Sequence, residues 1–270
     1  MTERFTNAVL SPAVDDHGTR MLTVYSSALG RRADITLYVP EVDRADRLPL
    51  LILLHGVHGS HWNWWALGGL AASLQKLKAR GDSCPFIIAM PSDGHWGSGT
   101  AYVPHTSFNA EAWIIDDVPA AVKSVLPNVD TTRLYLAGLS MGGYGAIRLG
   151  MKYADRVTGV SAHSSVTRIE QLVDHVQEPL SEFLYSGAEN VDIMHWVRQN
   201  REQIPSLRFD CGREDSLLEG NRALHEALIT AGVEHVYEEF DGGHTWDFWS
   251  AHLLHTLRFM SALAAQRRTD

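Results

Sequence analysis

The sequence predicts an α/β fold with a mostly parallel central sheet and helices on both of its faces. Short, almost wholly apolar segments alternate along the chain with segments in which apolar residues recur at helical spacing. Apolar segments of this kind are typical of parallel strands that are covered on both sides. A glycine-rich turn at 138–142 stands between one such strand and one such helix, as expected at the carboxyl end of a central strand.

The predicted elements follow one another in regular alternation. The segments 20–26 and 33–39 are rich in β-branched and aromatic residues, and we expect them to pair antiparallel at one edge of the sheet through a turn at 29–31. The expected parallel strands are 50–54, 86–90, 134–137, 157–162, 207–209 and 236–240. The expected helices are 67–79, 111–126, 141–153, 221–231 and 249–265, of which the second contains Pro119, either at a kink or in its first turn.

The length of 270 residues is consistent with one large domain over 1–270, since no repeat, low-complexity tract or linker interrupts the pattern. The segment 166–203 is less regular than the rest and contains breaks at Pro179 and Gly187. Two interpretations are equally open: a helical cover over the functional edge of the sheet, or plain packing helices.

Composition and charge exclude several classes of partner. The formal net charge of −9 and the absence of a basic run argue against a nucleic-acid partner. No apolar run is long enough for a membrane span, and no signal peptide is visible at the N-terminus. Two cysteines are too few for a disulfide framework, so we expect a reduced, cytoplasmic protein, although a chain trimmed of its signal would look the same. The sequence does not indicate an oligomeric state.

Gly138-Leu139-Ser140-Met141-Gly142 matches the G-x-S-x-G nucleophile elbow. In that motif a strained strand-to-helix turn exposes the serine hydroxyl, and the flanking glycines let strand and helix pass closely. The short pattern also arises by chance in turns. The predicted strand before it and helix after it favour the functional interpretation, with Ser140 as the nucleophile.

A serine nucleophile needs a base, and the base needs an orienting acid. In an α/β-hydrolase the chain order is serine, acid, histidine. Among fourteen histidines, His244 alone stands on a Gly-Gly loop after the last predicted strand and ahead of the final helix, and it is the predicted base.

Four carboxylates are candidates for the acid: Asp210, Glu214, Asp215 and Asp241. Asp215 is preferred because it lies several residues past the end of a strand, on a loop that can extend towards the serine. Glu214, its neighbour, is the second choice.

The oxyanion hole is expected to consist of two backbone N–H groups. One belongs to Met141, the residue after the nucleophile, and the other to the glycine-containing loop 55–60. Val57 is the preferred donor in that loop and His58 the alternative. His55 and His58 have no third ligand at a suitable spacing, so we expect no metal site.

Aromatic residues gather in the loops that should surround the site. His58, Trp62, Trp65 and Trp96 are candidates for substrate binding in an apolar acyl or aryl pocket, against the alternative of core packing. The tryptophans at the start of the last helix, Trp246 and Trp249, are expected to belong to the core.

Four motifs make the chain resemble the esterase D-type "putative esterase" family of α/β-hydrolases. They are His55-Gly56-x-x-Gly59-Ser60, Gly138-Leu139-Ser140-Met141-Gly142-Gly143, Cys211-Gly212-x-x-Asp215 and Gly243-His244-x-Trp246-x-x-Trp249. The likeness extends over 23–259. The family includes S-formylglutathione hydrolases and tributyrin, feruloyl and acetylxylan esterases, together with enterochelin esterases and mycolyltransferases. The loop 55–59 is more similar to the tributyrin-type branch than to the S-formylglutathione hydrolases, whose loop usually carries a cysteine.

The resemblance implies Ser140 as nucleophile, Asp215 as acid and His244 as base, with Val57 and Met141 as oxyanion donors and no cofactor. The implied activity is that of a serine carboxylesterase that hydrolyses short- to medium-chain carboxylic esters through an acyl-enzyme, with a small-molecule ester as partner. The alternatives are an S-formylglutathione hydrolase or feruloyl or acetyl esterase, an acyltransferase with the same triad, and a non-catalytic binding protein on the same fold.

Overall fold

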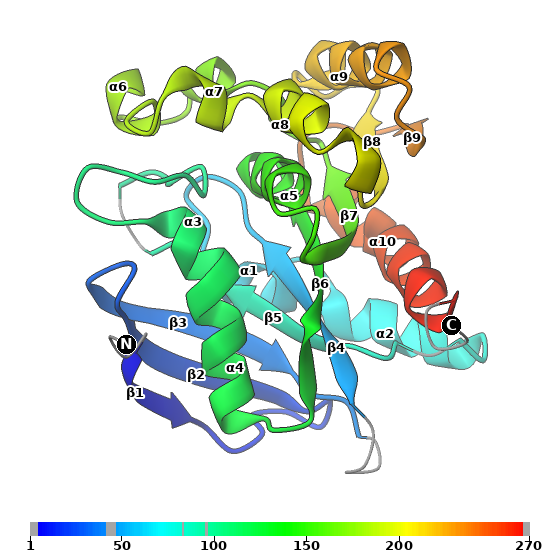
Figure 1. Cartoon of the computed structure of the whole chain (residues 1–270). Coiled ribbons are helices and arrows are strands. Elements are labelled where there is room, and N and C mark those ends of the chain that lie inside the picture. The colour runs from blue at the N-terminus through cyan, green and yellow to red at the C-terminus, as the bar shows by residue number, and fades with distance from the viewer. Residues whose placement is uncertain (1–4, 42–46, 83, 95–96, 267–270) are drawn as a thin grey trace.

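The computed structural model describes residues 5–41, 47–82, 84–94 and 97–266. These form a nine-stranded sheet with the strand order β1-β2-β3-β5-β4-β6-β7-β8-β9 (Figure 1). The pairs among β1, β2, β3 and β5 are antiparallel, and every pair from β5–β4 onward is parallel. The predicted fold class, mostly parallel with an antiparallel N-terminal edge, is therefore confirmed. The strands are β1 (Phe5–Leu10), β2 (Thr19–Ser26), β3 (Arg31–Tyr38), β4 (Leu48–Leu54), β5 (Ile87–Pro91), β6 (Val129–Leu139), β7 (Val157–His163), β8 (Ser206–Gly212) and β9 (His235–Phe240).

The expectation that the β2–β3 pair forms the edge of the sheet is wrong, because β1 pairs antiparallel with β2 outside it. The sequence gives little sign of this strand, since Asn7 interrupts its pattern and asparagine is depleted in strands. The register between β1 and β2 shifts between Phe5 and Ala8, which is common in an edge strand.

Helices cover both faces of the sheet. On one face, α2 (Leu70–Ala79) and α10 (Trp246–Gln266) pack with Trp64 of α1 (Asn63–Ala66) over the odd-numbered leucines of β4, Leu51 and Leu53. On the other face, Leu50, Ile52 and Leu54 contact a larger apolar core. Its helices are α3 (Ala110–Ala112), α4 (Val118–Val125), α5 (Met141–Lys152), α8 (Ile193–Gln199) and α9 (Leu218–Thr230).

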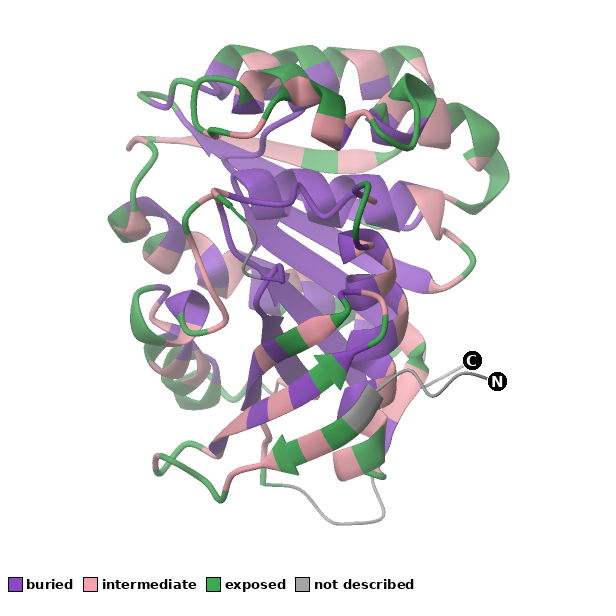
Figure 2. Ribbon diagram, turned by 90° about the vertical axis from the view of Figure 1, so that its left-hand side faces the viewer, coloured by how far each residue is buried: buried purple, intermediate pink, exposed green. Residues whose placement is uncertain are grey.

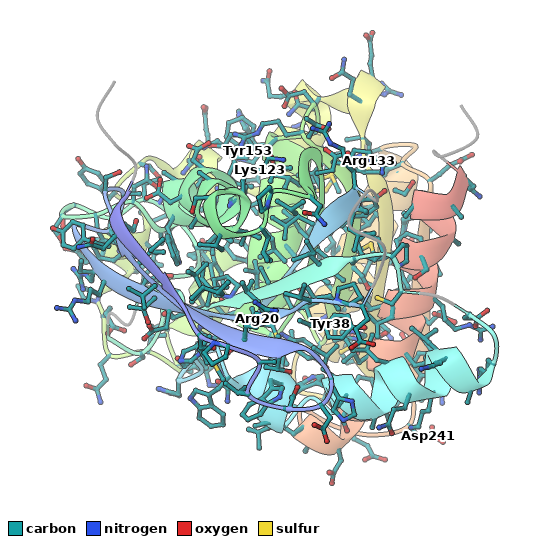
Figure 3. All side chains as sticks on the ribbon, turned by 90° about the horizontal axis from the view of Figure 1, so that it is seen from below. Arg20, Tyr38, Lys123, Arg133, Tyr153 and Asp241 are labelled. Carbon is teal, nitrogen blue, oxygen red and sulfur yellow. The ribbon has the colours of Figure 1, made fainter. Side chains whose placement is uncertain are left out.

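The sheet is the buried centre of the molecule. Central strands and the inner faces of the helices are buried, whereas β1 and the outer helix faces are partly or fully exposed (Figure 2). Seen from below, Lys123 of α4 and Tyr38, which packs on the α2–α10 core, lie on opposite sides of the sheet (Figure 3). An apolar side chain therefore meets a helix layer whichever way it points, which explains the unbroken apolar strands.

The predicted helix 111–126 consists of three pieces. The first piece is α3, which Asn109 caps by accepting the N–H of Ala112 at 2.9 Å. A π-helical turn follows at Trp113–Asp117, and α4 is the third piece. Pro119 lies in the first turn of α4, so the second of the two predicted positions is confirmed. Pro119 comes just after the π-helical turn, where the hydrogen-bond pattern changes from five residues back to four, so its missing N–H interrupts no regular α-helical ladder.

The segment 166–203 consists of short helices: 3₁₀ turns at Ile169–Leu172 and Arg201–Gln203, and α6 (Leu180–Phe183), α7 (Ala188–Val191) and α8. A fully buried arginine of α5, Arg148, fixes part of it. The Arg148 guanidinium donates to the carbonyl of Asn190, to the carbonyl of Tyr102 and to the carboxylate of Glu111, at 3.1, 2.7 and 2.7 Å. One charged side chain thereby joins α7, α3 and the loop at Tyr102 to α5, the helix that follows Ser140.

Within the described part of the chain, no helix combines the length and the apolar character that crossing a membrane requires.

Candidate active site

Ser140 occupies the turn between β6 and α5 with φ 54° and ψ −122°, a conformation that costs a non-glycine residue about 1–3 kcal/mol. The two glycines of the motif explain why the turn is possible. A Cβ at Gly142 would lie 2.3 Å from the carbonyl oxygen of Leu54, and one at Gly138 would lie 2.3 Å from that of Gly142. The helix can therefore start directly against two strands only with glycine at both positions.

The structure brings Ser140, His244 and Asp215 into one hydrogen-bonded chain. His244 Nε2 lies 3.0 Å from Ser140 Oγ, and His244 Nδ1 lies 2.9 Å from Asp215 Oδ2. Because an ionised carboxylate only accepts, the proton on the ring belongs to Nδ1, which leaves Nε2 to accept from the serine hydroxyl. Ser140 is 5% exposed, whereas a third of the His244 side chain, 33%, is open to solvent.

Asp215 is held in its ionised form. Burial on its own raises the pKa of this carboxyl group, but hydrogen bonds from His244 and from the backbone N–H of Leu217 outweigh it, and the pKa lies below its ordinary value. A carboxylate that stays charged at neutral pH can orient the imidazole and stabilise its protonated form.

The other three candidate acids lie elsewhere. Asp210 bonds to a different histidine, His163, and Glu214 is exposed. Asp241 is 90% exposed and pairs with Arg213 at 2.6 Å. Of the four carboxylates, only Asp215 contacts His244 through an ion pair or hydrogen bond among the described residues.

The loop 55–60 lies beside Ser140, because a Cβ at Gly56 would come within 3.3 Å of Ser140 Cβ. His58 N–H is already donated to the carbonyl of Ser98 at 2.8 Å, so this alternative oxyanion donor is occupied. The N–H groups of Val57 and Met141 make no hydrogen bond to a backbone or side-chain acceptor of the described residues. Both are thus available to a substrate oxygen.

His55 sets the direction of the Val57 N–H group. Its Nε2 accepts the N–H of Asp93 at 3.1 Å, so Nδ1 carries the proton and donates to the carbonyl of Gly56 at 2.7 Å. The Gly56 carbonyl and the Val57 N–H belong to one planar peptide group and point in opposite directions. Holding the carbonyl therefore aims the N–H away from it. This contact was not predicted, since His55 stands out in the sequence only as part of the motif 55–60 and as a possible metal ligand.

A second buried polar network lies directly beneath the site and was not predicted. His163, at the end of β7, has Nδ1 2.8 Å from Asp210 and Nε2 2.8 Å from the hydroxyl of Thr256 on α10. Arg208 lies 2.7 Å from the same Asp210 carboxylate, and the carbonyl of His163 accepts the N–H of Ser140 at 2.9 Å. This network resembles the chain of Ser140, His244 and Asp215 in composition but has no exposed hydroxyl, and its bond to the N–H of Ser140 supports the turn there.

The candidate substrate-binding residues are dispersed. His58 is exposed, with φ 57°, and Trp62 is 42% exposed at the start of α1. Trp65 packs against the α2–α10 core and donates its indole N–H to Asp15 at 3.1 Å. Trp96 lies outside the described residues.

The tryptophans of α10 are core residues that also reach the site. Trp249 is 6% exposed and packs edge-on against the His244 ring at 4.9 Å between ring centroids. Trp246 packs in the same way against Trp249 and against Trp64. Of these contacts, the one between Trp249 and His244 packs an indole ring directly against the imidazole that contacts Ser140.

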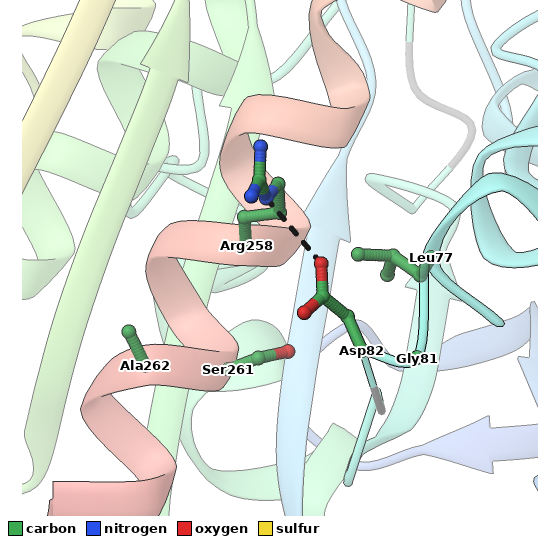
Figure 4. Close-up of a pocket in the computed structure, with 6 residues that line it drawn as sticks. All are labelled: Leu77, Gly81, Asp82, Arg258, Ser261 and Ala262. Atoms are coloured by element: carbon green, nitrogen blue, oxygen red, sulfur yellow. Dashed lines mark ion pairs between the residues drawn. The ribbon is translucent and has the colours of Figure 1, made fainter. Parts of the chain in front are cut away.

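A pocket of about 420 Å³ lies away from this site, between the end of α2 and the later turns of α10 (Figure 4). It is lined by Leu77, Gly81, Asp82, Arg258, Ser261 and Ala262 and contains an Arg258–Asp82 ion pair of 3.5 Å. Asp82 precedes β5, so the pocket lies at the amino ends of the parallel strands, whereas Ser140 follows a carboxyl end. No three histidine, cysteine or acidic residues of the described chain are grouped so as to hold a metal ion.

Solved structures share this fold over almost the whole chain. A ferulic acid esterase superposes with a TM-score of 0.77 at 23% identity, covering 95% of this chain and 98% of that one. An S-formylglutathione hydrolase from Staphylococcus aureus superposes with a TM-score of 0.77 at 19% identity, covering 94% and 99%. At these identities the likeness establishes the α/β-hydrolase fold.

Sequence comparison extends this to the family. An acetyl esterase from Caldicellulosiruptor saccharolyticus is 32% identical over 148 residues, which is 49% of this chain and 56% of that protein. The chain spans about half the length of the curated relatives it matches. The family model described as "Putative esterase" matches residues 26–260. The chain therefore belongs to the "Putative esterase" family.

Proposed function

We propose that the protein is a serine carboxylesterase that hydrolyses short- to medium-chain carboxylic esters through an acyl-enzyme on Ser140. The observation that carries the proposal is the hydrogen-bonded chain from Ser140 through His244 to the buried carboxylate of Asp215. Membership of the esterase family supports it, and the acetyl esterase among the relatives supports short acyl groups as substrates.

The geometry supports two-step acyl transfer. His244 Nε2 takes the proton of the Ser140 hydroxyl as the serine oxygen attacks the ester carbonyl. The N–H groups of Val57 and Met141 stabilise the oxyanion that forms. His244 then gives the proton to the leaving alcohol, and the acyl group remains on Ser140. Water, activated by the same histidine, releases the acid. Asp215 keeps Nδ1 protonated and stabilises the imidazolium in both steps.

We also infer that residues 1–270 act as one domain and that 166–203 covers the site. Contacts between this segment and the loop 97–109 support the second point, since Glu178 and Glu182 accept hydrogen bonds from Ser98 and Thr106.

The test is hydrolysis of 4-nitrophenyl acetate, butyrate and octanoate by the wild type and by Ser140→Ala. The wild type should show a burst of nitrophenol followed by turnover, and the variant should lose about 10⁴ or more in kcat. Absence of wild-type hydrolysis, or activity retained by the variant, would refute the proposal. Product analysis with an added alcohol separates hydrolysis from acyl transfer to the alcohol.

A further inference from the structure

The loop that carries Val57 is strained, and a hydrogen bond from another loop helps to hold it. His58 has φ 57°, which costs a non-glycine residue about 1–3 kcal/mol unless its surroundings maintain it. Residues 55–60 belong to no helix or strand, so no regular backbone ladder maintains the loop. Within the loop, Gly59 N–H donates to the carbonyl of Gly56 at 3.2 Å, and from outside the loop the carbonyl of Ser98 accepts the N–H of His58 at 2.8 Å.

Ser98 is in turn fixed by a side chain from the segment 166–203. The N–H of Ser98 donates to Glu178 Oε1 at 2.8 Å, and the hydroxyl of Ser98 accepts the N–H of Gln177 at 3.4 Å. A Cβ at Gly97 would lie 1.6 Å from Glu178 Oε1, so the backbone approaches the carboxylate as closely as glycine permits. Glu178 Oε2 is buried and accepts no hydrogen bond from the described residues. Among these residues, the carboxylate is therefore bonded through Oε1, to the N–H of Ser98.

We infer that Glu178 is a positioning residue for the oxyanion hole. It fixes Ser98, Ser98 fixes His58, and the peptide groups on both sides of Val57 are then held: one through His58 N–H and the other through the Gly56 carbonyl. Without the Glu178 bond, His58 can relax from its positive φ, and the Val57 N–H is then held only through the Gly56 carbonyl. The inference rests on the proposed function and adds a link between the segment 166–203 and the chemistry.

The neighbouring Glu182 provides a matched control. It lies on the same segment and accepts the Thr106 hydroxyl at 2.9 Å, in the same loop as Ser98. Thr106 is exposed, and no hydrogen bond of the described residues connects it to the loop 55–60. Removing either carboxylate deletes one contact between the two segments, but only Glu178 leads to Val57.

The experiment measures kcat, KM and the thermal unfolding midpoint for the wild type, Glu178→Ala, Glu178→Gln and Glu182→Ala with 4-nitrophenyl butyrate. Glu178→Ala should lower kcat roughly tenfold at unchanged KM. This loss is smaller than the decrease of about 10²–10³ in kcat that removal of a whole oxyanion donor causes, because the Val57 N–H is still present. Glu178→Gln keeps an acceptor oxygen and should stay near the wild type, as should Glu182→Ala. Inhibition by a trifluoromethyl ketone, whose adduct places an oxyanion in the same hole, should weaken in Glu178→Ala by the same factor as kcat.

The inference is overturned if Glu178→Ala keeps its kcat, if Glu182→Ala loses as much, or if Glu178→Gln falls with the alanine variant. If Glu178→Ala does not fold, Gly97→Ala replaces it, since its methyl group displaces the same carboxylate; unchanged kcat in that variant also overturns the inference. A wild type without esterase activity is a separate result, which refutes the proposed function.

Discussion

Two buried aspartates five residues apart should respond in opposite ways to the same substitution. Asp215 lies 2.9 Å from Nδ1 of His244, and Asp210 lies 2.8 Å from Nδ1 of His163. Changing either to asparagine preserves its shape and removes its charge. Only His244 contacts Ser140, so only Asp215→Asn should abolish the chemistry.

For Asp215→Asn, the asparagine amide can donate to Nδ1, which favours the tautomer with the proton on Nε2 and leaves no base for Ser140. In a serine triad this change lowers kcat by about 10⁴ while the fold is kept. For Asp210→Asn the main effect is on stability. The fully buried Asp210 carboxylate is the partner of Arg208 at 2.7 Å, and leaving a buried charge without its partner costs about 3–5 kcal/mol. Arg208 keeps a second partner in Glu238, at 2.8 Å, which places the expected loss at the lower end of that range.

The assay combines kcat for 4-nitrophenyl acetate with urea unfolding of both variants. Asp215→Asn should unfold close to the wild-type midpoint and be almost inactive. Asp210→Asn should unfold at clearly lower urea, and its folded fraction should keep kcat within about tenfold, a loss of at most about 1.4 kcal/mol in transition-state stabilisation. An active Asp215→Asn, or an Asp210→Asn of normal stability that is inactive, would refute the assignment of the two networks.

Two further predictions concern the proposed donor Val57 and two buried histidines. Val57→Pro removes the proposed N–H donor and should lower kcat by about 10²–10³, whereas Val57→Ala keeps the N–H and should have a kcat near that of the wild type. Steady-state kinetics measures kcat, and circular dichroism checks that both variants fold. Equal kcat values in the two variants would exclude Val57 as a donor. Burial lowers the pKa of His105 and of His252 below 6.5, so the unfolded chain binds more protons than the folded one below that pH. The free energy of unfolding should therefore fall as the pH drops below 6.5, and it should fall by less in His252→Gln than in the wild type. Urea unfolding at about pH 8 and at about pH 5 measures both losses. An equally large loss in His252→Gln would show that His252 does not contribute.

The parts of the fold and site that were predictable are those that depend on local sequence. The parallel strands are apolar because both of their faces are covered, and Ser140 and His244 stand in short motifs bounded by glycine. The edge strand β1 was missed because its pairing with β2 depends on backbone hydrogen bonds rather than on an apolar pattern.

The contacts that were not predictable join residues far apart in the chain. Asp210 and Asp215 are chemically alike, and which histidine each meets depends on the direction of its side chain relative to β7 and to the loop after β9. The bond from Glu178 to Ser98 spans eighty residues and leaves no periodic signal in the sequence. The sequence pattern around His55, a histidine followed by glycine, does not distinguish a metal ligand from a loop residue that bonds to the backbone, as His55 does to the Gly56 carbonyl.

Covalent labelling with a fluorophosphonate, followed by peptide mass spectrometry, tests directly whether Ser140 is an activated nucleophile. The label should be found on the peptide that contains Ser140 and on that residue alone, and labelling should be much slower in His244→Ala. It should be absent from Ser140→Ala. A label on another serine, or none on the folded wild type, would contradict the assignment of Ser140 as an activated nucleophile.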